Sequence, residues 1–310
     1  MIRHLLEPFD LTMEETEKLL SVAREIEKDP VLYQDVARRK RIATLFYEAS
    51  TRTRLSHETA MQKLGGDVIG FPSANVSSVS KGETIEDTAR VINCYADIIA
   101  MRHPMAGAPA IAAKYSSIPV INAGDGGNEH PTQTLLDLYT IQKRLGRLDN
   151  FSIGFCGDLK FGRTVHSLTK SLTRYNNIHF YFISPEELKM PKNLLNDSMS
   201  YTETDNLESV IGKVDILYMT RIQQERFASD EEYQKFKGVY ILDGEKMKMA
   251  KENMAVLHPF PRVDEITPEV DDDKRAAYFE QAQNGVYVRM ALIMALLGLK
   301  DPKTDSYILN

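Results

Sequence analysis

One stretch, Ile42 to Arg54 with the sequence IATLFYEASTRTR, joins a short apolar run to a cluster of hydroxyl and guanidinium groups. The apolar run is typical of a buried β-strand, and the polar residues after it indicate the start of a helix. A helix N-terminus binds anions through its unpaired backbone amides and its dipole. Arg52 adds a planar group that can bind two phosphate oxygens at once. The stretch therefore predicts a strand-to-helix junction that binds phosphate or a phosphorylated small molecule.

A structural role for the same residues is the alternative. Ser or Thr before a helix is an ordinary N-cap, and an arginine near a helix start is often solvated. Arg54 is interpreted as structural, because it lies about 200° round a helix from Arg52 and the two cannot face one ligand. Whether Arg52 and Thr53 bind a ligand or serve only the helix depends on evidence from other parts of the chain.

Composition narrows the class of protein. The chain has 310 residues, 43% hydrophobic and 26% charged, which is ordinary for a soluble globular protein of two domains. No apolar run approaches the about 18 residues of a membrane span, and no signal-peptide core opens the chain, so a cytoplasmic location is expected. The two cysteines lack metal or disulfide spacing. A net charge of −6 argues against general nucleic-acid binding, so an anionic substrate would need a local cluster of cations.

Short β-type runs alternate with helical patterns along the chain. The expected strands are Ile42–Phe46, Val68–Phe71, Ile98–Met101, Val120–Asn122, Ile153–Cys156, His179–Ile183, Ile216–Met219, Val239–Leu242 and Val256–His258. The expected helices are a capped helix from Thr12 to about Lys28, then Thr51–Leu64, Thr84–Ala96, Ala108–Tyr115, Thr132–Leu145, Thr164–Arg174, Asp230–Lys237 and Val286–Leu297.

This alternation predicts an α/β protein with two doubly wound parallel-sheet domains. We expect residues 1–131 with 286–310 to form one domain and residues 132–285 to form the other. Open parallel sheets bind ligands beyond the carboxyl ends of their strands. The active site is therefore expected in the crevice between the two domains.

Residues that can bind anions follow six of the expected strands. They are Ser50–Thr53, Arg102, His130, Arg163, Arg221 and the segment from His258 to Arg262. His130 and Gln133 are one helical turn apart, and His can donate to a developing oxyanion while Gln can accept from an NH₂ group. The alternative for His130 is a simple helix cap.

Two further signals are weaker. A polar loop of about ten residues carries Lys81 and is longer than usual, as lids often are. The glycines at Gly154, Gly157 and Gly162 depart from the dinucleotide-binding pattern, which argues against a nicotinamide cofactor, and no ATP-binding P-loop is present.

Taken together, these segments resemble the transcarbamoylase family over nearly the whole chain. The matching motifs are Phe46–Arg54, Ser80–Thr84, Met101–Pro104, Asn122–Gly126, His130–Asp137, Gly157–Ser167, Asp215–Arg221 and His258–Glu265. Motifs of this length, in this order, are highly specific.

Residue types also choose among the members of the family. Ornithine-specific members use a His-Cys-Leu-Pro segment and a Ser-Met-Gly segment, whereas this chain has His258-Pro259-Phe260-Pro261 and no Ser-Met-Gly. Arg163 and Arg221 suit the two carboxylates of aspartate and would repel the extra ammonium of ornithine. Aspartate is therefore the expected second substrate. The alternatives are transfer to ornithine or an acylated ornithine, a non-catalytic anion-binding module, and an NAD-dependent dehydrogenase.

The resemblance implies transfer of a carbamoyl group from carbamoyl phosphate to the α-amine of L-aspartate, an early step of pyrimidine biosynthesis, without cofactor or metal. It implies that carbamoyl phosphate is bound by Ser50, Thr51, Arg52, Thr53, Arg102, His130, Gln133, Pro259, Phe260 and Pro261. Of these, Arg52, Thr53, Arg102 and His130 would be catalytic. Aspartate would be bound by Lys81, Arg163, Arg221 and Gln223. Phe260 stands where the family usually has Leu, but its backbone carbonyl is the group presented to the substrate.

The resemblance also implies partners. Ser77 and Lys81 are expected to reach a neighbouring subunit's site, which makes a homotrimer with shared active sites. Glu48 is expected to pair with Arg163 and Arg226 on domain closure. A separate zinc-containing regulatory chain is a further candidate partner.

Overall fold

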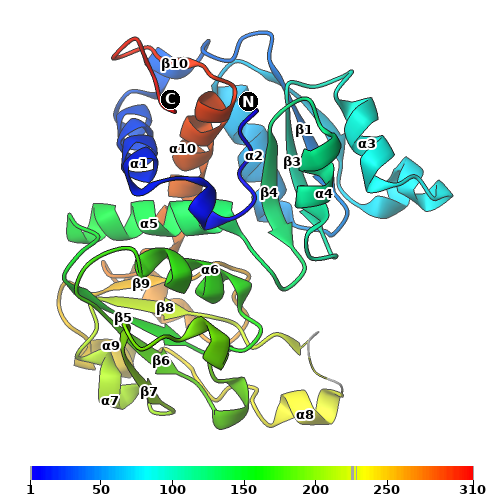
Figure 1. Ribbon diagram of the computed structural model, residues 1–310. Helices are drawn as coiled ribbons and strands as arrows, with labels where there is room; N and C mark the ends of the chain where they lie inside the picture. The colour runs from blue at the N-terminus through cyan, green and yellow to red at the C-terminus, as the bar shows by residue number, and fades with distance from the viewer. Residues whose placement is uncertain (1, 225–226, 228, 310) are drawn as a thin grey trace. The chain divides into compact units, whose positions relative to one another are not determined.

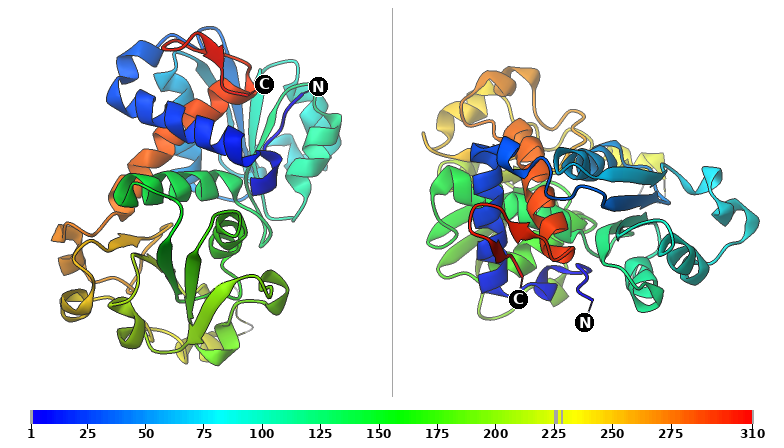
Figure 2. Two further views of the ribbon diagram at one scale, coloured as in Figure 1. Left: turned by 60° about the vertical axis from the view of Figure 1, so that its left-hand side comes forward. Right: turned by 90° about the horizontal axis from the view of Figure 1, so that it is seen from above.

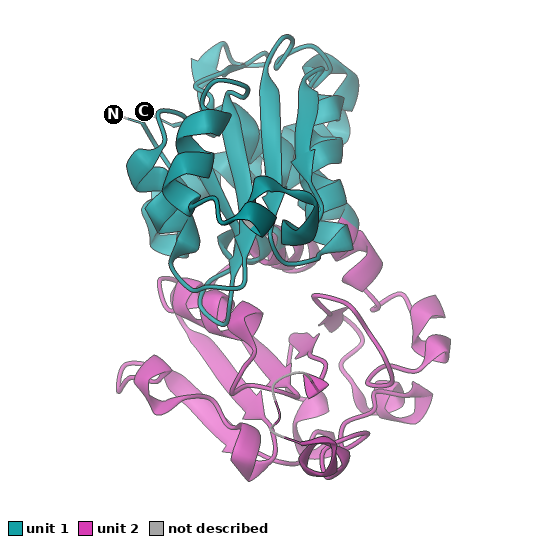
Figure 3. Cartoon of the chain, turned by 90° about the vertical axis from the view of Figure 1, so that its right-hand side faces the viewer, with its two compact units in different colours: residues 1–136, 283–310 teal, residues 137–282 magenta. Residues whose placement is uncertain are grey.

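The computed structural model describes residues 2–224, 227 and 229–309. The chain divides into two compact units, coloured teal and magenta in Figure 3. Unit 1 comprises Met1–Leu136 and Gln283–Asn310, and unit 2 comprises Asp137–Ala282. The chain passes from one unit to the other inside two helices, α5 (Pro131–Leu145) and α10 (Tyr278–Leu296).

In the described part of unit 1, four parallel strands form a sheet in the order β2-β1-β3-β4, of which Figure 1 labels β1, β3 and β4. They are β1 (Arg41–Phe46), β2 (Asp67–Phe71), β3 (Ile98–His103) and β4 (Val120–Asp125). All neighbouring pairs are parallel. The four apolar runs expected in the first half of the chain are therefore confirmed as strands of one parallel sheet.

Helices cover both faces of this sheet. They are α1 (Met13–Lys28), α2 (Thr51–Lys63), α3 (Ile85–Ile92) and α4 (Ala108–Tyr115). Figures 1 and 2 show α2 on one face and α3 with α4 on the other. The expected cap of α1 is confirmed, because the Glu15 amide donates to the Thr12 hydroxyl at 3.1 Å. The expected helix Thr84–Ala96 is shorter in the structure and ends at Ile92.

In the described part of unit 2, five parallel strands lie in the order β7-β6-β5-β8-β9. They are β5 (Phe151–Cys156), β6 (Ile178–Ile183), β7 (Ser200–Thr204), β8 (Ile216–Met219) and β9 (Ala255–Leu257). The helices confined to this unit are α6 (Arg163–Leu172), α7 (Glu208–Ile211), α8 (Asp230–Gln234) and α9 (Gly244–Met249).

The core of unit 2 reflects the alternation of side chains along β8. Leu217 and Met219 pack with apolar residues of α7 and α9, whereas Tyr218 points to the opposite face of the sheet. The predicted fold class, two domains built on parallel sheets with helices, is confirmed.

One strand prediction was wrong. Val239–Leu242 was expected to be a strand, but it forms only an isolated bridge, from Leu242 to Ile266. The sheet of unit 2 instead contains a strand that was not expected, β7, whose residues pair with β6 from Ser200 to Thr204. Four of its five residues are exposed and its composition is polar, so β7 has no apolar run. An exposed edge strand is stabilised mainly by its backbone pairing, and hydrophobic patterning does not reveal it.

The chain ends in a short antiparallel pair, β10 (Lys300–Asp301) and β11 (Ser306–Tyr307). Among the residues that the structure describes, no helix has the length and apolar character needed to cross a membrane.

His57 is the most deeply buried titratable group of α2. Its side chain is fully buried, and its Nδ1 lies 2.8 Å from the Thr53 carbonyl oxygen four residues earlier. Burial, with the nearby positive charge of Arg289, lowers the pKa of His57 to about 3. The unfolded chain, with an ordinary histidine pKa of about 6.5, therefore takes up a proton in a pH range where the folded chain does not.

We predict that His57 makes the protein less stable as pH falls below about 6.5, with a slope of up to about 1.4 kcal/mol per pH unit. The His57→Phe variant removes this linkage. From about pH 7 to about pH 5, the free energy of unfolding of the variant should rise by about 2 kcal/mol relative to the parent chain. Urea unfolding at both pH values measures this difference. A difference that stays constant with pH would contradict the prediction and indicate a packing effect only.

Candidate active site

The junction between β1 and α2 supplies the first group of candidate residues. Ser50 occupies the N-cap position of α2, yet its side chain makes no cap hydrogen bond to the first turn. The capping role considered as the alternative for Ser50 is therefore not observed. Thr53 is buried within the first turn, while Thr51 and Arg52 are exposed. Arg54 forms an ion pair with Glu58, at 3.5 Å between Nε and Oε1, which supports the structural interpretation of Arg54.

Arg102 lies beside this junction because of the register between β1 and β3. Arg102 pairs with Phe46, the last residue of β1, and its carbonyl accepts a 2.8 Å hydrogen bond from the Tyr47 amide. The Arg102 side chain is largely buried, and its Nη2 lies 3.4 Å from a carboxylate oxygen of Glu48. A buried guanidinium beside the N-terminus of α2 extends the anion-binding surface that begins at Ser50.

The strand order explains why these residues meet. From β1 the chain first adds β2 on one side and then β3 on the other, so the order reverses between β1 and β3. Ligands of open parallel sheets bind at such a reversal, beyond the carboxyl ends of the strands. The N-terminus of α2, after β1, and Arg102, at the end of β3, both lie at this reversal.

The loop from β4 to α5 is fixed by a buried carboxylate. Asp125 accepts hydrogen bonds from the amides of Gly107 and Glu129, at 2.7 and 3.0 Å, and from the side chains of Asn122 and Asn128, at 2.9 and 3.0 Å. No role was predicted for Asp125, although the sequence places it in a glycine-rich turn after an expected strand. Its four hydrogen bonds set the path of the chain into the next helix.

That helix begins with the predicted pair of polar side chains. His130 and Gln133 are 4% and 9% exposed, and the Gln133 amide donates to the His130 carbonyl at 3.0 Å. His130 directly precedes α5 and Gln133 lies in its first turn, and α5 follows β4, the strand next to β3. The structure thus places the His130 imidazole and the Gln133 amide at the same sheet edge as Arg102.

Unit 2 repeats this arrangement at β5 and β8. The strand order reverses between these two strands, and their ends approach closely. Gly157, at φ +122°, has room for no side chain, because a Cβ would lie 2.4 Å from the Thr220 carbonyl oxygen. Arg163 begins α6 after β5, and Arg221 and Gln223 follow β8. Two arginines are therefore carried by the two loops at the reversal.

A buried carboxylate links the same two loops. Asp158 accepts from the Phe161 amide at 2.9 Å and from the Gln223 side chain at 3.4 Å. Burial raises the pKa of Asp158, and these hydrogen bonds offset only part of that effect. Asp158 was not predicted as a functional residue, because nothing in its sequence neighbourhood indicates that Gln223 would contact it.

In the segment after β9, the groups predicted to contact the substrate are backbone carbonyls and not side chains. Phe260 adopts a left-handed backbone conformation, with φ +54°, and the Phe260–Pro261 peptide bond is cis. The Phe260 ring packs against Tyr278 and Phe279, with ring centroids 5.8 and 5.5 Å apart. Its side chain is therefore engaged in packing.

Comparisons with known proteins agree with this geometry. The family model "Aspartate/ornithine carbamoyltransferase, carbamoyl-P binding domain" matches residues 3–143. The model "Aspartate/ornithine carbamoyltransferase, Asp/Orn binding domain" matches residues 149–296. Together the two models cover most of the chain. The chain belongs to the aspartate/ornithine carbamoyltransferase family. The resemblance inferred from the motifs is confirmed, and the dehydrogenase alternative has no support.

Relatives within this carbamoyltransferase family are similar over nearly their whole length. The aspartate carbamoyltransferase catalytic subunit of Lachnoclostridium phytofermentans is 57% identical over 303 residues, covering 96% of this chain and 99% of the relative. A solved catalytic subunit of M. jannaschii aspartate transcarbamoylase has a TM-score of 0.88 and 47% identity, covering 95% of this chain and 98% of that one. The Trypanosoma cruzi enzyme, solved with carbamoyl phosphate and aspartate, has a TM-score of 0.88, 37% identity, and coverage of 94% and 95%.

Two of the residues that the carbamoyltransferase resemblance assigns to a neighbouring site lie in the loop after β2. The loop contains two short 3₁₀ helices, Ala74–Val76 and Ser78–Lys81, rather than a structureless lid. Ser77 lies between them and donates to the Ala74 carbonyl at 2.8 Å, and Lys81 is exposed. Arg226, the expected partner of Glu48, lies outside the described residues. The pairing of Glu48 with Arg163 and Arg226 stays a prediction.

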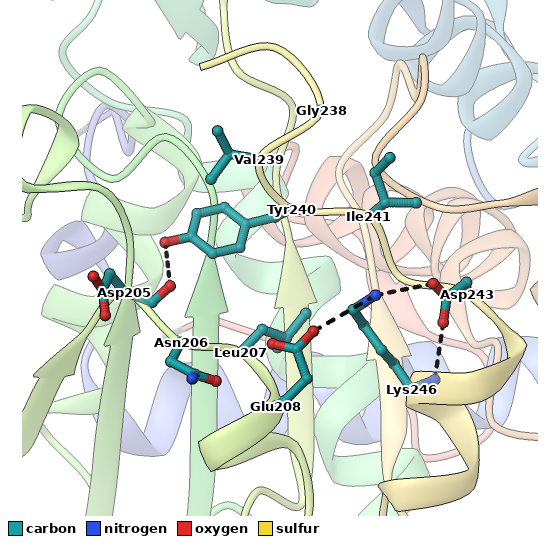
Figure 4. Close-up of a pocket in the computed structure, with 10 residues that line it drawn as sticks. All are labelled: Asp205, Asn206, Leu207, Glu208, Gly238, Val239, Tyr240, Ile241, Asp243 and Lys246. Carbon is teal, nitrogen blue, oxygen red and sulfur yellow. Dashed lines mark hydrogen bonds and ion pairs between the residues drawn. The ribbon is translucent and has the colours of Figure 1, made fainter. Parts of the chain in front are cut away.

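A polar pocket of about 450 Å³ lies elsewhere in unit 2, where β7 ends (Figure 4). The Tyr240 side chain points across it and donates to the Asp205 carbonyl at 2.9 Å. Lys246 lies between Asp243 and Glu208, at 2.9 and 3.7 Å. This pocket was not predicted, and its lining residues differ from those assigned to the substrates.

Proposed function

We propose that the chain is an aspartate carbamoyltransferase, which transfers the carbamoyl group of carbamoyl phosphate to the α-amine of L-aspartate. The products are N-carbamoyl-L-aspartate and phosphate, and the reaction is an early step of pyrimidine biosynthesis. The observation that carries the proposal is the pair of strand-order reversals, each with arginines at the ends of its two strands. The names of the relatives and the ligands of the T. cruzi structures support the same reaction.

Unit 1 supplies the proposed ligands for the phosphate and the carbonyl oxygen of carbamoyl phosphate. The phosphate would be bound by the first turn of α2, through Ser50, Thr51, Arg52 and Thr53, and by Arg102. Thr53, Arg102 and His130 would stabilise the charge that grows on the carbonyl oxygen during attack. Gln133 and the backbone carbonyls of Pro259 and Phe260 would orient the carbamoyl NH₂ group, with Pro261 ending that turn.

Unit 2 supplies the proposed site for aspartate. Arg163 and Arg221 carry two positive charges on adjacent loops, which matches the two carboxylates of aspartate. Gln223 and Lys81 would complete the binding of this substrate. Each arginine would lose favourable charge pairing if ornithine, with its additional ammonium, took the place of aspartate.

The proposed chemistry needs no covalent intermediate. The aspartate amine attacks the carbonyl carbon, the carbon–nitrogen bond forms, and the carbon–oxygen bond to phosphate breaks. The enzyme contributes by positioning the two anions and by neutralising their charge. The departing phosphate is the proposed acceptor of the proton that the amine loses, and His130 acts as a hydrogen-bond donor rather than as the base.

The proposal assigns the chain's residues to two functional domains. Residues 1–131 with 286–310 would form the carbamoyl phosphate-binding domain and residues 132–285 the aspartate-binding domain, which would also contribute Gln133, Pro259 and Phe260 to the carbamoyl NH₂ group. The enzyme would act in the cytoplasm. A separate zinc-containing regulatory chain is a candidate partner, since the similar curated proteins are named catalytic subunits.

The amine specificity provides the direct test of the function. The purified chain should form carbamoyl-aspartate from carbamoyl phosphate and L-aspartate. Turnover with ornithine or an acylated ornithine should be lower by about 100-fold or more, because the two arginines leave an ammonium without a partner. A colorimetric assay for ureido products, run with each amine, measures the ratio. Turnover of ornithine in the absence of aspartate turnover would refute the proposal.

Two neighbouring arginines of α2 form a matched pair for testing the phosphate site. The Arg52→Ala variant should lower kcat by about 10²–10³-fold, the typical cost of removing one aimed donor from a developing charge. The Arg54→Ala variant loses only an ion pair within the helix and should stay within about threefold of the parent rate. Steady-state kinetics on both variants decide the matter. Equal losses in the two variants would mean that the motif acts through helix stability.

We further propose a homotrimer in which Ser77 and Lys81 of one subunit serve the site of the next. Both residues lie on the loop after the edge strand β2, and Lys81 is exposed. A side chain with these properties can reach a neighbouring molecule without rearrangement of the sheet. Such a trimer requires two chains for each complete site.

Mixing of two inactive variants tests the shared site. Lys81→Ala and Arg52→Ala chains, exchanged in a one-to-one mixture, should recover about a quarter of the parent activity, because random assembly of a cyclic trimer completes about one site in four. Subunit exchange is verified by native mass spectrometry. If exchange is complete and activity does not return, both residues act within one chain and the shared site is refuted.

A further inference from the structure

A network of buried polar side chains extends through unit 2 to the segment after β9. Its members come from α5, β8, α10 and the segment after β9, and each is at most 5% exposed. They are Tyr218, Asp137, Gln281, His258 and Glu265. Buried polar groups at this depth are costly unless they are hydrogen-bonded, and a fully bonded network fixes a single arrangement.

The links of this network are short. Tyr218 donates to one carboxylate oxygen of Asp137 at 2.9 Å, and the Gln281 amide group donates to the other at 2.6 Å. The Gln281 oxygen accepts from the His258 backbone amide at 2.8 Å. Helices α5 and α10 and strand β8 thus hold the backbone at His258, where the last strand of the sheet ends.

The side chain of His258 continues the network in two directions. The Phe260 amide lies 2.8 Å from Nδ1, so Nδ1 accepts a hydrogen bond and carries no proton. The proton is then on Nε2, which donates to Glu265 at 2.6 Å. His258 is therefore held as one neutral tautomer, with its acceptor nitrogen directed at the Phe260 amide.

Glu265 secures this tautomer. Its second carboxylate oxygen accepts from the backbone amides of Val263 and Asp264, both at 3.1 Å. Burial alone would raise the pKa of Glu265, but the hydrogen bond from His258, together with backbone hydrogen bonds that include the Val263 amide, outweighs burial, and the pKa lies below the ordinary value. An ionised Glu265 accepts hydrogen bonds only, which leaves Nε2–H as the matching donor.

The group held by His258 has an unfavourable backbone conformation. Phe260 has φ +54°, a region that non-glycine residues other than Asn and Asp rarely adopt. Such a conformation is unfavourable for a non-glycine residue and persists when its surroundings impose it. The hydrogen bond from the Phe260 amide to Nδ1 is an interaction that imposes it.

We propose that His258 is a positioning residue, which holds the Phe260 backbone through Nδ1 and thereby sets the direction of the Pro259 and Phe260 carbonyls. The Tyr218–Asp137–Gln281 link fixes His258 itself. The inference rests on the proposed role of these two carbonyls in orienting the carbamoyl NH₂ group. It assigns the imidazole no contact with substrate.

Two substitutions by amide residues distinguish the contributions of the two imidazole nitrogens of His258. The His258→Asn variant retains an acceptor near the position of Nδ1 and loses the donor to Glu265. The His258→Gln variant retains a donor near the position of Nε2 and loses the acceptor for the Phe260 amide. Both variants break one hydrogen bond, so a purely structural role of His258 predicts similar losses of activity in both.

We expect kcat to fall by about 100-fold in His258→Gln and by no more than about tenfold in His258→Asn. The KM for carbamoyl phosphate should stay within about threefold in both, because the phosphate is bound by unit 1. The Tyr33→Phe variant is the control, since it removes another buried Tyr–Asp hydrogen bond, of 3.0 Å to Asp301, in unit 1. Its kcat should match that of the parent chain, whatever its loss of stability.

Kinetics and urea unfolding of the three variants give a decision. If His258→Asn loses as much activity as His258→Gln, or if His258→Gln stays near the parent rate, the positioning role is refuted. If His258→Gln does not fold, Gln281→Met replaces it and should lower kcat about tenfold at constant KM. An unchanged kcat in that variant would also refute the role. Absence of carbamoyl-aspartate formation by the parent chain is a separate result, which would refute the proposed function instead.

Discussion

In both sheets the strand order reverses once, between β1 and β3 in unit 1 and between β5 and β8 in unit 2. At a reversal the two following segments leave the sheet in opposite directions, so a hollow beyond the strand ends is not covered by its own helices. The candidate phosphate ligands follow β1 and end β3, and the two arginines proposed for aspartate follow β5 and β8. The placement of the proposed chemistry therefore depends on the topology of the sheets, before any side chain is considered.

The charges of the chain are distributed to suit this topology. The net charge is −6, yet arginines gather at the strand ends where an anionic substrate would bind. Glu48 lies 3.4 Å from the guanidinium of Arg102 and partly balances its charge. A carboxylate at this distance reduces the cost of burying an arginine, while the exposed first turn of α2 leaves further donors for a phosphate.

Much of the fold and of the candidate site could be predicted because it depends on local patterns. Continuous apolar runs identified eight of the strands, and strand ends located Arg52, Arg102 and Arg163. The polar edge strand β7 was missed because backbone pairing, not patterning, holds it. The network around His258 could not be predicted either. Gln281 and Asp137 are separated by 144 positions, and only the folded chain shows that they share a hydrogen bond.

The two reversals are proposed to bind the two substrates of one reaction. A crystal structure of this chain with N-(phosphonacetyl)-L-aspartic acid, the ligand of one of the T. cruzi structures, tests this proposal most directly. We expect the phosphonate at the first turn of α2 with Arg102, and the two carboxylates at Arg163 and Arg221. A ligand whose carboxylates occupy the α2 turn, or which binds in the pocket beside Tyr240, would refute this assignment.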